Sequence, residues 1–237
     1  MVAVLETPRR RTKQSKPIRP LPLENGDRLT RCEFERRYDA MPNLRKAELI
    51  EGVVQMPSPI RIEHMEADLA VITWLGVYVV VTPGVRGGGD GSVRLDADNE
   101  LQPDALLRIE EACGGQSRVA ADGFIEGAPE LVVEISGSSA SYDLHAKLNI
   151  YRRAGVREYV VWRVYDDAID WFVQEEGRFV AQTPDEQGVY ASKVFPGLRL
   201  PVQAMLTGKL ADVLAAVQQG VQAPEHAASV GQLHCDA

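Results

Sequence analysis

Two short apolar segments on either side of a helix-length stretch constrain the fold of this chain most strongly. Residues 131–135 have the sequence LVVEI, and residues 158–162 have the sequence EYVVW. An apolar run of this length is typical of a central strand that is buried on both faces of a sheet. The stretch between them predicts a helix that ends at Gly155, since glycine commonly follows the last helical residue. A helix crossing between two buried strands predicts a mixed α/β fold.

Further patterns predict elements on both sides of this unit. Thr30 followed by Glu33 is a capping-box signature that opens a short helix through Tyr38. Glu51-Gly52 marks the turn of a hairpin within residues 47–56. Apolar side chains that recur every three or four positions predict a long helix, and they are Ile62, Met65, Leu69, Ile72 and Leu75. Strands are expected over residues 168–173, 179–182 and 189–194, followed by a helix over residues 202–219.

The domain organisation expected from 237 residues is one domain with two tails. Residues 1–27 are rich in proline, arginine and lysine and lack apolar periodicity, which predicts a basic disordered arm. Residues 28–219 are expected to form the folded domain, and residues 220–237 a flexible tail.

The charge of the chain is unevenly distributed. The net charge is −8, but residues 1–19 carry +5, which leaves −13 on the remainder. An acidic body argues against a broad basic surface that grips long DNA. It does not exclude a nuclease, because clustered carboxylates can hold cations. The basic arm has two interpretations, which are phosphate contacts and improved solubility.

The compartment expected for this protein is the cytoplasm, with no membrane partner. The first residues contain no apolar signal-peptide segment. The longest apolar run covers residues 69–81 and has 13 residues, whereas a membrane span needs about 20. This run is expected to be a buried helix that continues into a strand or loop. The cysteines, Cys32, Cys113 and Cys235, form no CxxC pair, which favours reduced thiols.

Two acids occupy strand-like apolar runs. Asp104 starts one predicted strand and Glu134 lies near the end of another. Each acid alone is compatible with a solvated strand end. However, Glu134 has four apolar companions, and an unpaired buried carboxylate is costly, which favours a bound cation or a salt-bridge partner. If the strands are neighbours, both carboxylates converge at one edge, where Mg²⁺ or Mn²⁺ could polarise a phosphodiester.

A third group lies on the helix that follows. Asp143, Lys147 and Tyr151 are spaced at i, i+4 and i+8, so they share one helix face. One interpretation is an ordinary surface pair between Asp143 and Lys147. The other places the long Lys147 side chain beside Glu134, where an ammonium group would stabilise developing negative charge. The spacing alone does not decide between them.

These residues resemble the site of a known superfamily. Pro103-Asp104, Glu134-Ile135-Ser136 and the displaced Lys147 resemble the PD-(D/E)XK motif of restriction-endonuclease-like proteins. The wider pattern is similar to the Uma-type endonucleases from Leu29 to about Leu206. The matching positions include Glu48 to Gly52, His64, Pro129 to Glu134 and Gly155 to Tyr159. Ser136 stands where the superfamily's usual motif has its lysine, so catalysis would depend on Lys147.

The resemblance implies a restriction-endonuclease-like core, a mixed β-sheet flanked by helices with additional strands. It also implies hydrolysis of nucleic acid, with DNA as the expected substrate, using Mg²⁺ or Mn²⁺. By the same resemblance, Asp104, Glu134 and the Ile135 backbone carbonyl hold the metal, and Lys147 takes the lysine role. The carboxylate of Glu48 completes the site, and the side chains of His64 and Tyr151 are candidates for substrate contact.

Two further questions stay open at this stage. The alternative to an endonuclease is a non-catalytic module on the same fold that binds nucleic acid or protein. The displaced lysine, the acidic body and the basic arm motivate that alternative. A homodimer, in which two chains jointly shape a groove, is compatible with the negative body, but no residue pattern demonstrates one.

Overall fold

The computed structural model describes residues 20–57 and 59–233. Its first half contains α1 (Arg31–Tyr38), β1 (Glu48–Ile50), β2 (Val53–Gln55), α2 (Ile62–Val81), β3 (Val85–Gly88), β4 (Val93–Arg94), β5 (Glu100–Leu101), β6 (Ala105–Ile109), β7 (Arg118–Val119) and β8 (Ile125–Glu126). Its second half contains β9 (Leu131–Ser136), α3 (Ala140–Tyr142), α4 (Leu148–Ala154), β10 (Glu158–Arg163), β11 (Ala168–Glu175), β12 (Arg178–Ala181), β13 (Val189–Ala191), β14 (Arg199–Pro201), α5 (Val202–Leu206), α6 (Leu210–Val221) and α7 (Pro224–Gln232). A π-helical turn, Asp143–Lys147, joins α3 to α4.

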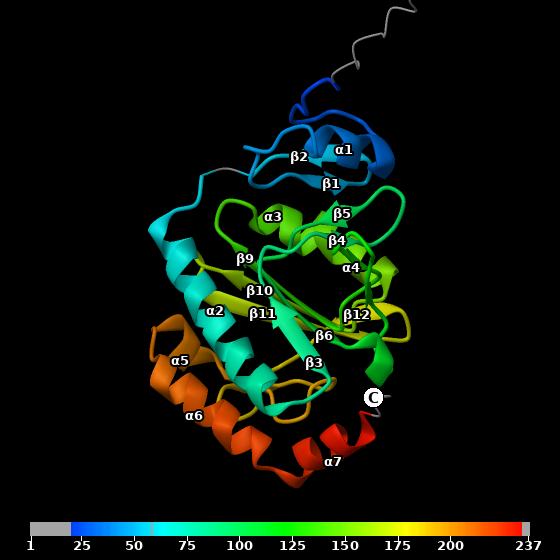
Figure 1. Cartoon of the computed structure of the whole chain (residues 1–237). Helices are drawn as coiled ribbons and strands as arrows, with labels where there is room; N and C mark the ends of the chain where they lie inside the picture. The colour runs from blue at the N-terminus through cyan, green and yellow to red at the C-terminus, as the bar shows by residue number, and fades with distance from the viewer. Residues whose placement is uncertain (1–19, 58, 234–237) are drawn as a thin grey trace, which may run out of the picture.

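The central sheet has the strand order β12-β11-β10-β9-β6-β3. Strands β9 and β10 pair in parallel, because the helical segment between them carries the chain back to the same end of the sheet. Strand β6 pairs with β9 in the antiparallel sense, so the sheet is mixed. A second sheet, ordered β2-β1-β5-β4-β8-β7, lies toward the N-terminal part of the chain (Figure 1). The predicted mixed α/β architecture with additional strands is confirmed.

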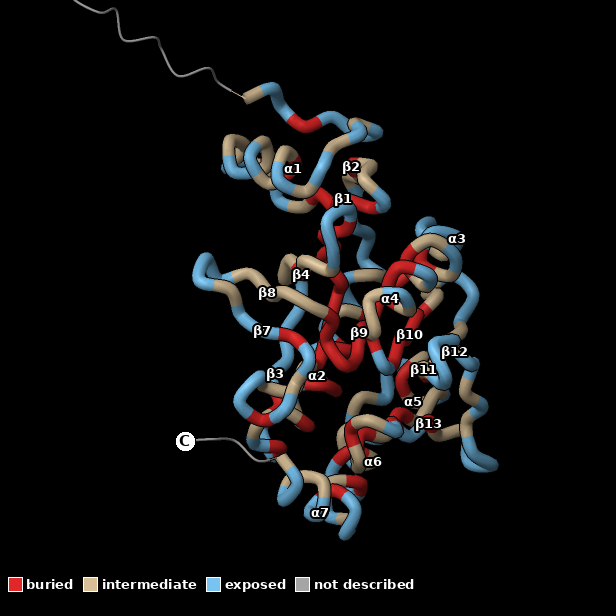
Figure 2. The backbone as a smooth tube through the Cα atoms, turned by 90° about the vertical axis from the view of Figure 1, so that its right-hand side faces the viewer, coloured by how far each residue is buried: buried red, intermediate tan, exposed pale blue. Residues whose placement is uncertain are grey.

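Helices cover both faces of the central sheet. Leu131, Val133 and Ile135 pack in one core with residues of α2, α5 and α6. The intervening Val132 packs in a second core with Ile150 of α4. Side chains alternate between the two faces of a strand, so Glu134 belongs to the face that α4 covers. Figure 2 shows β9 and β10 as buried strands at the centre of the molecule.

The helix predicted from the apolar repeat is α2, but most of the repeat lies outside the core. The run after Leu69 stays helical to Val81 and does not continue into a strand. Ala67, Val71, Trp74 and Tyr78 face the core, whereas most of the predicted repeat is exposed. By length and composition α2 could cross a membrane, a property that core helices of soluble proteins share. The inner face of α2 packs on the central sheet and is part of the hydrophobic core.

Three other expectations need correction. Residues 20–27 were expected in the disordered arm, but Leu23 is buried beside Phe34, and residues 1–19 lie outside the described chain. The expected flexible tail contains α7 up to residue 232. Its His226 is buried, with Nε2 2.9 Å from Thr82 Oγ1, because the helix packs beside the end of α2. Cys32 is free, but Cys113 is disulfide-bonded, so the expectation of reduced thiols is wrong for Cys113.

Candidate functional site

The first two acids meet where the chain passes between the two sheets. Residues 102–104 link β5 of the second sheet to β6 of the central sheet. Ala105 pairs with Val133, so the antiparallel register places Asp104 beside Glu134. The backbone N–H of Ile135 donates to Asp104 Oδ2 at 2.7 Å, which fixes that carboxylate against β9. The two strands are therefore neighbours, as convergence of the acids requires.

Glu48 comes to the same place from β1 of the second sheet. Its side chain is almost fully buried. The backbone N–H of Gln102 donates to Glu48 Oε1 at 2.8 Å. The linker that carries Asp104 therefore also orients Glu48, so residues from distant parts of the sequence reach the same junction.

Lys147 joins two of these carboxylates. Its Nζ donates to Glu134 Oε1 and to Glu48 Oε1, both at 3.0 Å. Tyr151, one turn further along, donates its hydroxyl to Glu134 Oε1 at 2.8 Å. Both side chains are buried, which excludes the interpretation of an ordinary surface ion pair. In the described chain no residue donates a hydrogen bond to Glu134 Oε2, which leaves that oxygen available as a ligand atom.

The π-helical turn contains both Asp143 and Lys147. Asp143 Oδ2 accepts hydrogen bonds from Ser136 Oγ at 2.6 Å and from Ser139 Oγ at 2.8 Å. Its Oδ1 lies 3.8 Å from Lys147 Nζ. Such single wide turns are often found at functional sites. Ser136, at the position of the motif's usual lysine, therefore anchors the turn from which the displaced lysine projects.

Lys46 is a site residue that the sequence reasoning did not identify. Its Nζ lies 3.2 Å from Asp104 Oδ1 and 3.5 Å from Asp90 Oδ1. His64 Nε2 lies 3.7 Å from the same Asp104 oxygen, so the predicted proximity of this histidine to the site is present. A signal for Lys46 existed, because residues two apart in an extended chain share a face, and Lys46 lies two positions before Glu48.

The charges of the site shift one another strongly. Burial raises the pKa of Glu134 to about 8, with Lys147 opposing this rise and Asp104 adding to it. Burial opposes the charge of Lys147, but Glu134, Glu48 and Asp143 together hold its pKa well above the ordinary value. Burial likewise lowers the pKa of Lys46, an effect that Asp104 and the other carboxylates outweigh. Both lysines therefore stay cationic at neutral pH.

The donor atoms suit a hard divalent cation, although the two lysines lie among them. Carboxylate oxygens are the ligands that Mg²⁺ prefers. Within residues 20–57 and 59–233, no three His, Cys, Asp or Glu side chains converge as a ready metal-binding group. The ammonium groups explain this, because each lies between carboxylates and holds them at hydrogen-bond distance from nitrogen. A cation at Asp104 and Glu134 would have to displace or reorient Lys46.

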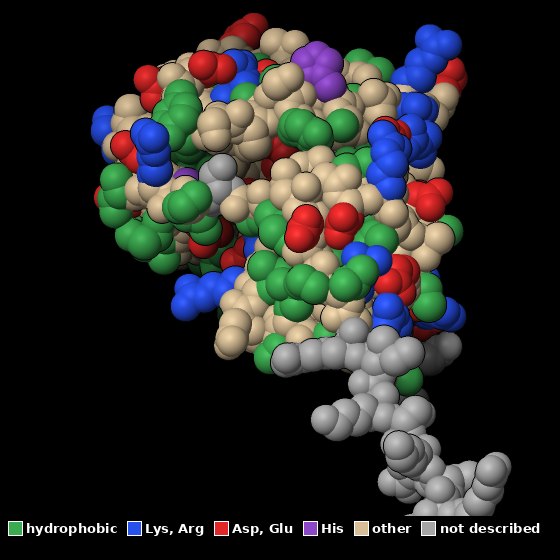
Figure 3. Space-filling model, turned by 90° about the horizontal axis from the view of Figure 1, so that it is seen from above, with side chains coloured by type: hydrophobic (Ala, Val, Ile, Leu, Met, Phe, Trp, Pro, Cys, Tyr) green, Lys and Arg blue, Asp and Glu red, His purple; other side chains and the backbone are tan. Residues whose placement is uncertain are grey.

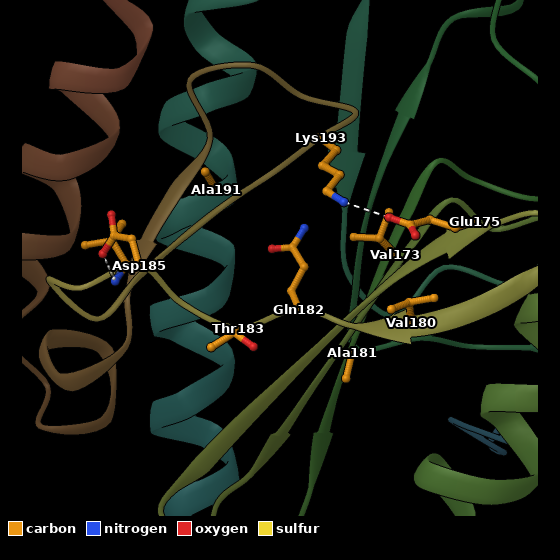
Figure 4. A pocket seen from close by; sticks show the side chains of 10 residues that line it. Val173, Glu175, Val180, Ala181, Gln182, Thr183, Asp185, Ala191 and Lys193 are labelled. Carbon is orange, nitrogen blue, oxygen red and sulfur yellow. Dashed lines mark hydrogen bonds and ion pairs between the residues drawn. The ribbon is translucent and has the colours of Figure 1, made fainter.

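The site is distinct from a cavity on the far side of the sheet. That cavity has a volume of about 430 Å³ and lies among β11, β12 and β13. Figure 4 shows Lys193 and Glu175 paired across its rim, with Gln182 pointing into it. It contains none of the predicted site residues. The predicted site residues lie instead at the junction of the two sheets.

Comparison with known proteins identifies the family. The chain belongs to the Uma2 family, described as "Putative restriction endonuclease", whose model matches residues 32–203. The fold is similar to the crystal structure of a protein from Anabaena variabilis described as "a putative nuclease belonging to DUF820". The TM-score is 0.50 at 13% identity, and the match covers 73% of this chain and 92% of that one. No curated protein matches.

Proposed function

We propose that this protein is a metal-dependent endonuclease that hydrolyses phosphodiester bonds, with DNA as its substrate. The observation that carries the proposal is the single ammonium group of Lys147, 3.0 Å from both Glu134 and Glu48 at the junction that also holds Asp104. Membership of the Uma2 family, described as "Putative restriction endonuclease", supports nucleic acid as the substrate class. The site residues named below are part of the proposal.

Asp104, Glu134 and the Ile135 carbonyl would hold Mg²⁺ or Mn²⁺, with Glu48 completing the set. When bound, the cation supplies electrophilic activation of the phosphate and of a water molecule. Hydrogen bonds from the protein orient these carboxylates. Gln102 N and Ile135 N each donate to one carboxylate, and Tyr151 fixes one oxygen of Glu134. Oriented ligands of this kind hold a metal more tightly than free carboxylates.

Lys147 supplies the positive charge that the protein itself contributes to the reaction. Its pKa is raised, so it remains an ammonium group. Placed among the carboxylates, it orients the attacking water and stabilises the negative charge that develops on the phosphate. Lys46 is partly exposed and pairs with Asp104. Once the Lys46 ammonium group leaves Asp104, it contacts the phosphate. Lys147 thus acts on the buried side of the site and Lys46 on its open side.

Charge also bears on how nucleic acid is held. Figure 3 shows acidic and basic side chains interspersed over one face of the molecule, without a broad basic stripe. The basic segment of residues 1–19, outside the described chain, supplies phosphate contacts in this proposal. Deleting residues 1–19 is expected to weaken nucleic-acid binding by a larger factor at low salt than at high salt.

The test is cleavage of supercoiled plasmid by the full chain with Mg²⁺, Mn²⁺ or EDTA. Asp104→Asn should abolish cleavage, since it removes a ligand charge without changing shape. The matched control is Glu175→Gln, which alters an exposed acid that pairs with Lys193 away from the site. Cleavage that survives Asp104→Asn or EDTA would overturn the proposal. Salt-dependent DNA binding without any cleavage would instead identify a binding module.

A further inference from the structure

The outward face of α2 is an exposed apolar stripe. Ile62, Met65 and Leu69 are 54%, 56% and 64% exposed, and Val80 is 84% exposed. Figure 1 shows α2 along one outer side of the molecule, beside β3 and above α6. Of the twelve large hydrophobic side chains that are exposed in the described residues, seven lie between Ile60 and Val81. The concentration on one helix indicates an interaction surface, because scattered exposure would need no explanation.

The spacing of the stripe matches a helical partner. Positions 62, 65, 69, 72 and 76 alternate in steps of three and four, as in the seam of two packed helices. Ile72 is partly exposed within this series. Gly76 has open space where a side chain would project, which allows another helix to approach closely. An extended segment would not match this period, so the occupant is a helix.

We propose that this surface binds a second copy of the chain, with the two α2 helices antiparallel about a twofold axis. A twofold interface uses the same patch on both copies, so the patch must be self-complementary. The N-terminal end of the helix carries exposed Glu63 and Glu66, whereas residues 69–81 contain no charged side chain. A parallel pair would bring the acidic ends together, and an antiparallel pair separates them.

The opposite end of the surface offers charge complementarity. Arg86, whose side chain is 63% exposed, follows shortly after the end of α2, and its guanidinium group already pairs with Glu110. Its neighbour Gly87 lies against Val79 of the helix. The antiparallel arrangement therefore brings the acidic end of one α2 toward an end that carries an exposed guanidinium group. Repulsion between the two acidic ends is thereby avoided.

The available area requires β3 as well as α2. A helix of 20 residues is about 30 Å long and about 10 Å wide, so α2 alone covers on the order of 300 Å². A stable dimer buries about 800 Å² on each partner. Strand β3 ends the central sheet, and no other strand of the described chain pairs with its outer edge. The free edge beside α2 therefore extends the surface, which is independent of any reaction at the junction of the two sheets.

The experiment is sedimentation equilibrium of the full chain, with light scattering after gel filtration. The wild type should have twice the 26.1 kDa mass of the chain, and Leu69→Lys should have the single mass. Val180→Lys is the matched control, because Val180 is 46% exposed on β12, which is the opposite edge strand of the sheet. It should remain dimeric. Circular dichroism and thermal unfolding report whether each variant is folded.

A charge-complementation arm keeps the test decisive if Leu69→Lys proves unstable. Mixing Leu69→Lys with Leu69→Glu should restore the dimer mass, whereas each variant alone should not. A wild type that stays monomeric at about 100 µM, which corresponds to a binding free energy weaker than about 5.5 kcal/mol, would overturn the proposal. So would a dimer that survives Leu69→Lys. A monomer that binds neutral lipid vesicles, with binding lost in Leu69→Lys, would assign the stripe to a membrane surface instead.

Discussion

Lys147 Nζ lies 3.0 Å from Glu134 Oε1, across a gap of thirteen residues in the sequence. The same nitrogen lies 3.0 Å from Glu48, so replacing it with Met leaves buried carboxylates without their cation. Lys147→Met is expected to lower plasmid cleavage by about 100-fold or more. It should also lower the free energy of unfolding by about 3 kcal/mol, the low end for breaking a buried ion pair.

Loss of activity must therefore be separated from loss of folding. Lys193→Met is the control, because Lys193 pairs with Glu175 at 2.8 Å on the exposed rim of the other cavity. It should change neither cleavage nor stability by more than a few tenths of a kcal/mol. Urea unfolding identifies conditions in which Lys147→Met is folded. Wild-type cleavage by the folded variant would exclude Lys147 from catalysis.

Tyr151→Phe tests whether the tyrosine positions Glu134. The hydroxyl donates to Glu134 Oε1 at 2.8 Å, and both groups are buried. Removing it should cost about 1 kcal/mol of stability and weaken Mn²⁺ binding by about 10-fold. Calorimetric titration measures the binding. The control, Tyr142→Phe, changes an exposed tyrosine, and a loss of Mn²⁺ affinity of equal size there would contradict the positioning role.

The residues that lie together at the charged centre could be selected from the sequence because short-range rules and one resemblance both applied to them. Asp104 and Glu134 were expected to converge only if their strands were neighbours, and periodicity cannot reveal strand order. The antiparallel pairing of β6 with β9 depends on the tertiary structure, which local sequence patterns do not encode. Lys147 was ambiguous for the same reason, since its i, i+4 spacing to Asp143 fits both a surface pair and a buried site.

The parts that failed depend on contacts between distant segments. Large apolar side chains lie on both faces of α2, with Trp74 and Tyr78 buried and Met65 and Leu69 exposed, so apolar periodicity alone could not identify the buried face. Its buried face is formed partly by Ala67 and Ala70, whose small side chains let the helix approach the sheet. The C-terminal residues look weakly apolar, yet His226 is buried through a partner in a segment 144 residues away.

Lys46→Met tests whether this lysine competes with the metal. Its Nζ lies 3.2 Å from Asp104 Oδ1, where a ligand oxygen would face the cation. Removing one positive charge at that distance should tighten Mn²⁺ binding by about 10-fold, which corresponds to ~1.4 kcal/mol. Calorimetry of the metal alone gives the answer without relying on cleavage. Weaker binding would mean that Lys46 holds Asp104 in place, and Lys193→Met should leave the affinity unchanged.

Glu100 makes stability depend on pH away from the proposed site. Burial of this β5 side chain raises its pKa from 4.5 to about 7, Glu35 adds to the rise, and Arg94 opposes it. Between these values the folded chain holds a proton that the unfolded chain releases, so stability falls as pH rises from about 4.5 to about 7. Glu100→Gln should remove up to about 3 kcal/mol of that fall. Urea unfolding of both proteins at pH 5 and pH 8 measures the difference, with exposed Glu186→Gln as the control. Equal declines in the wild type and Glu100→Gln would show that the proton is held elsewhere.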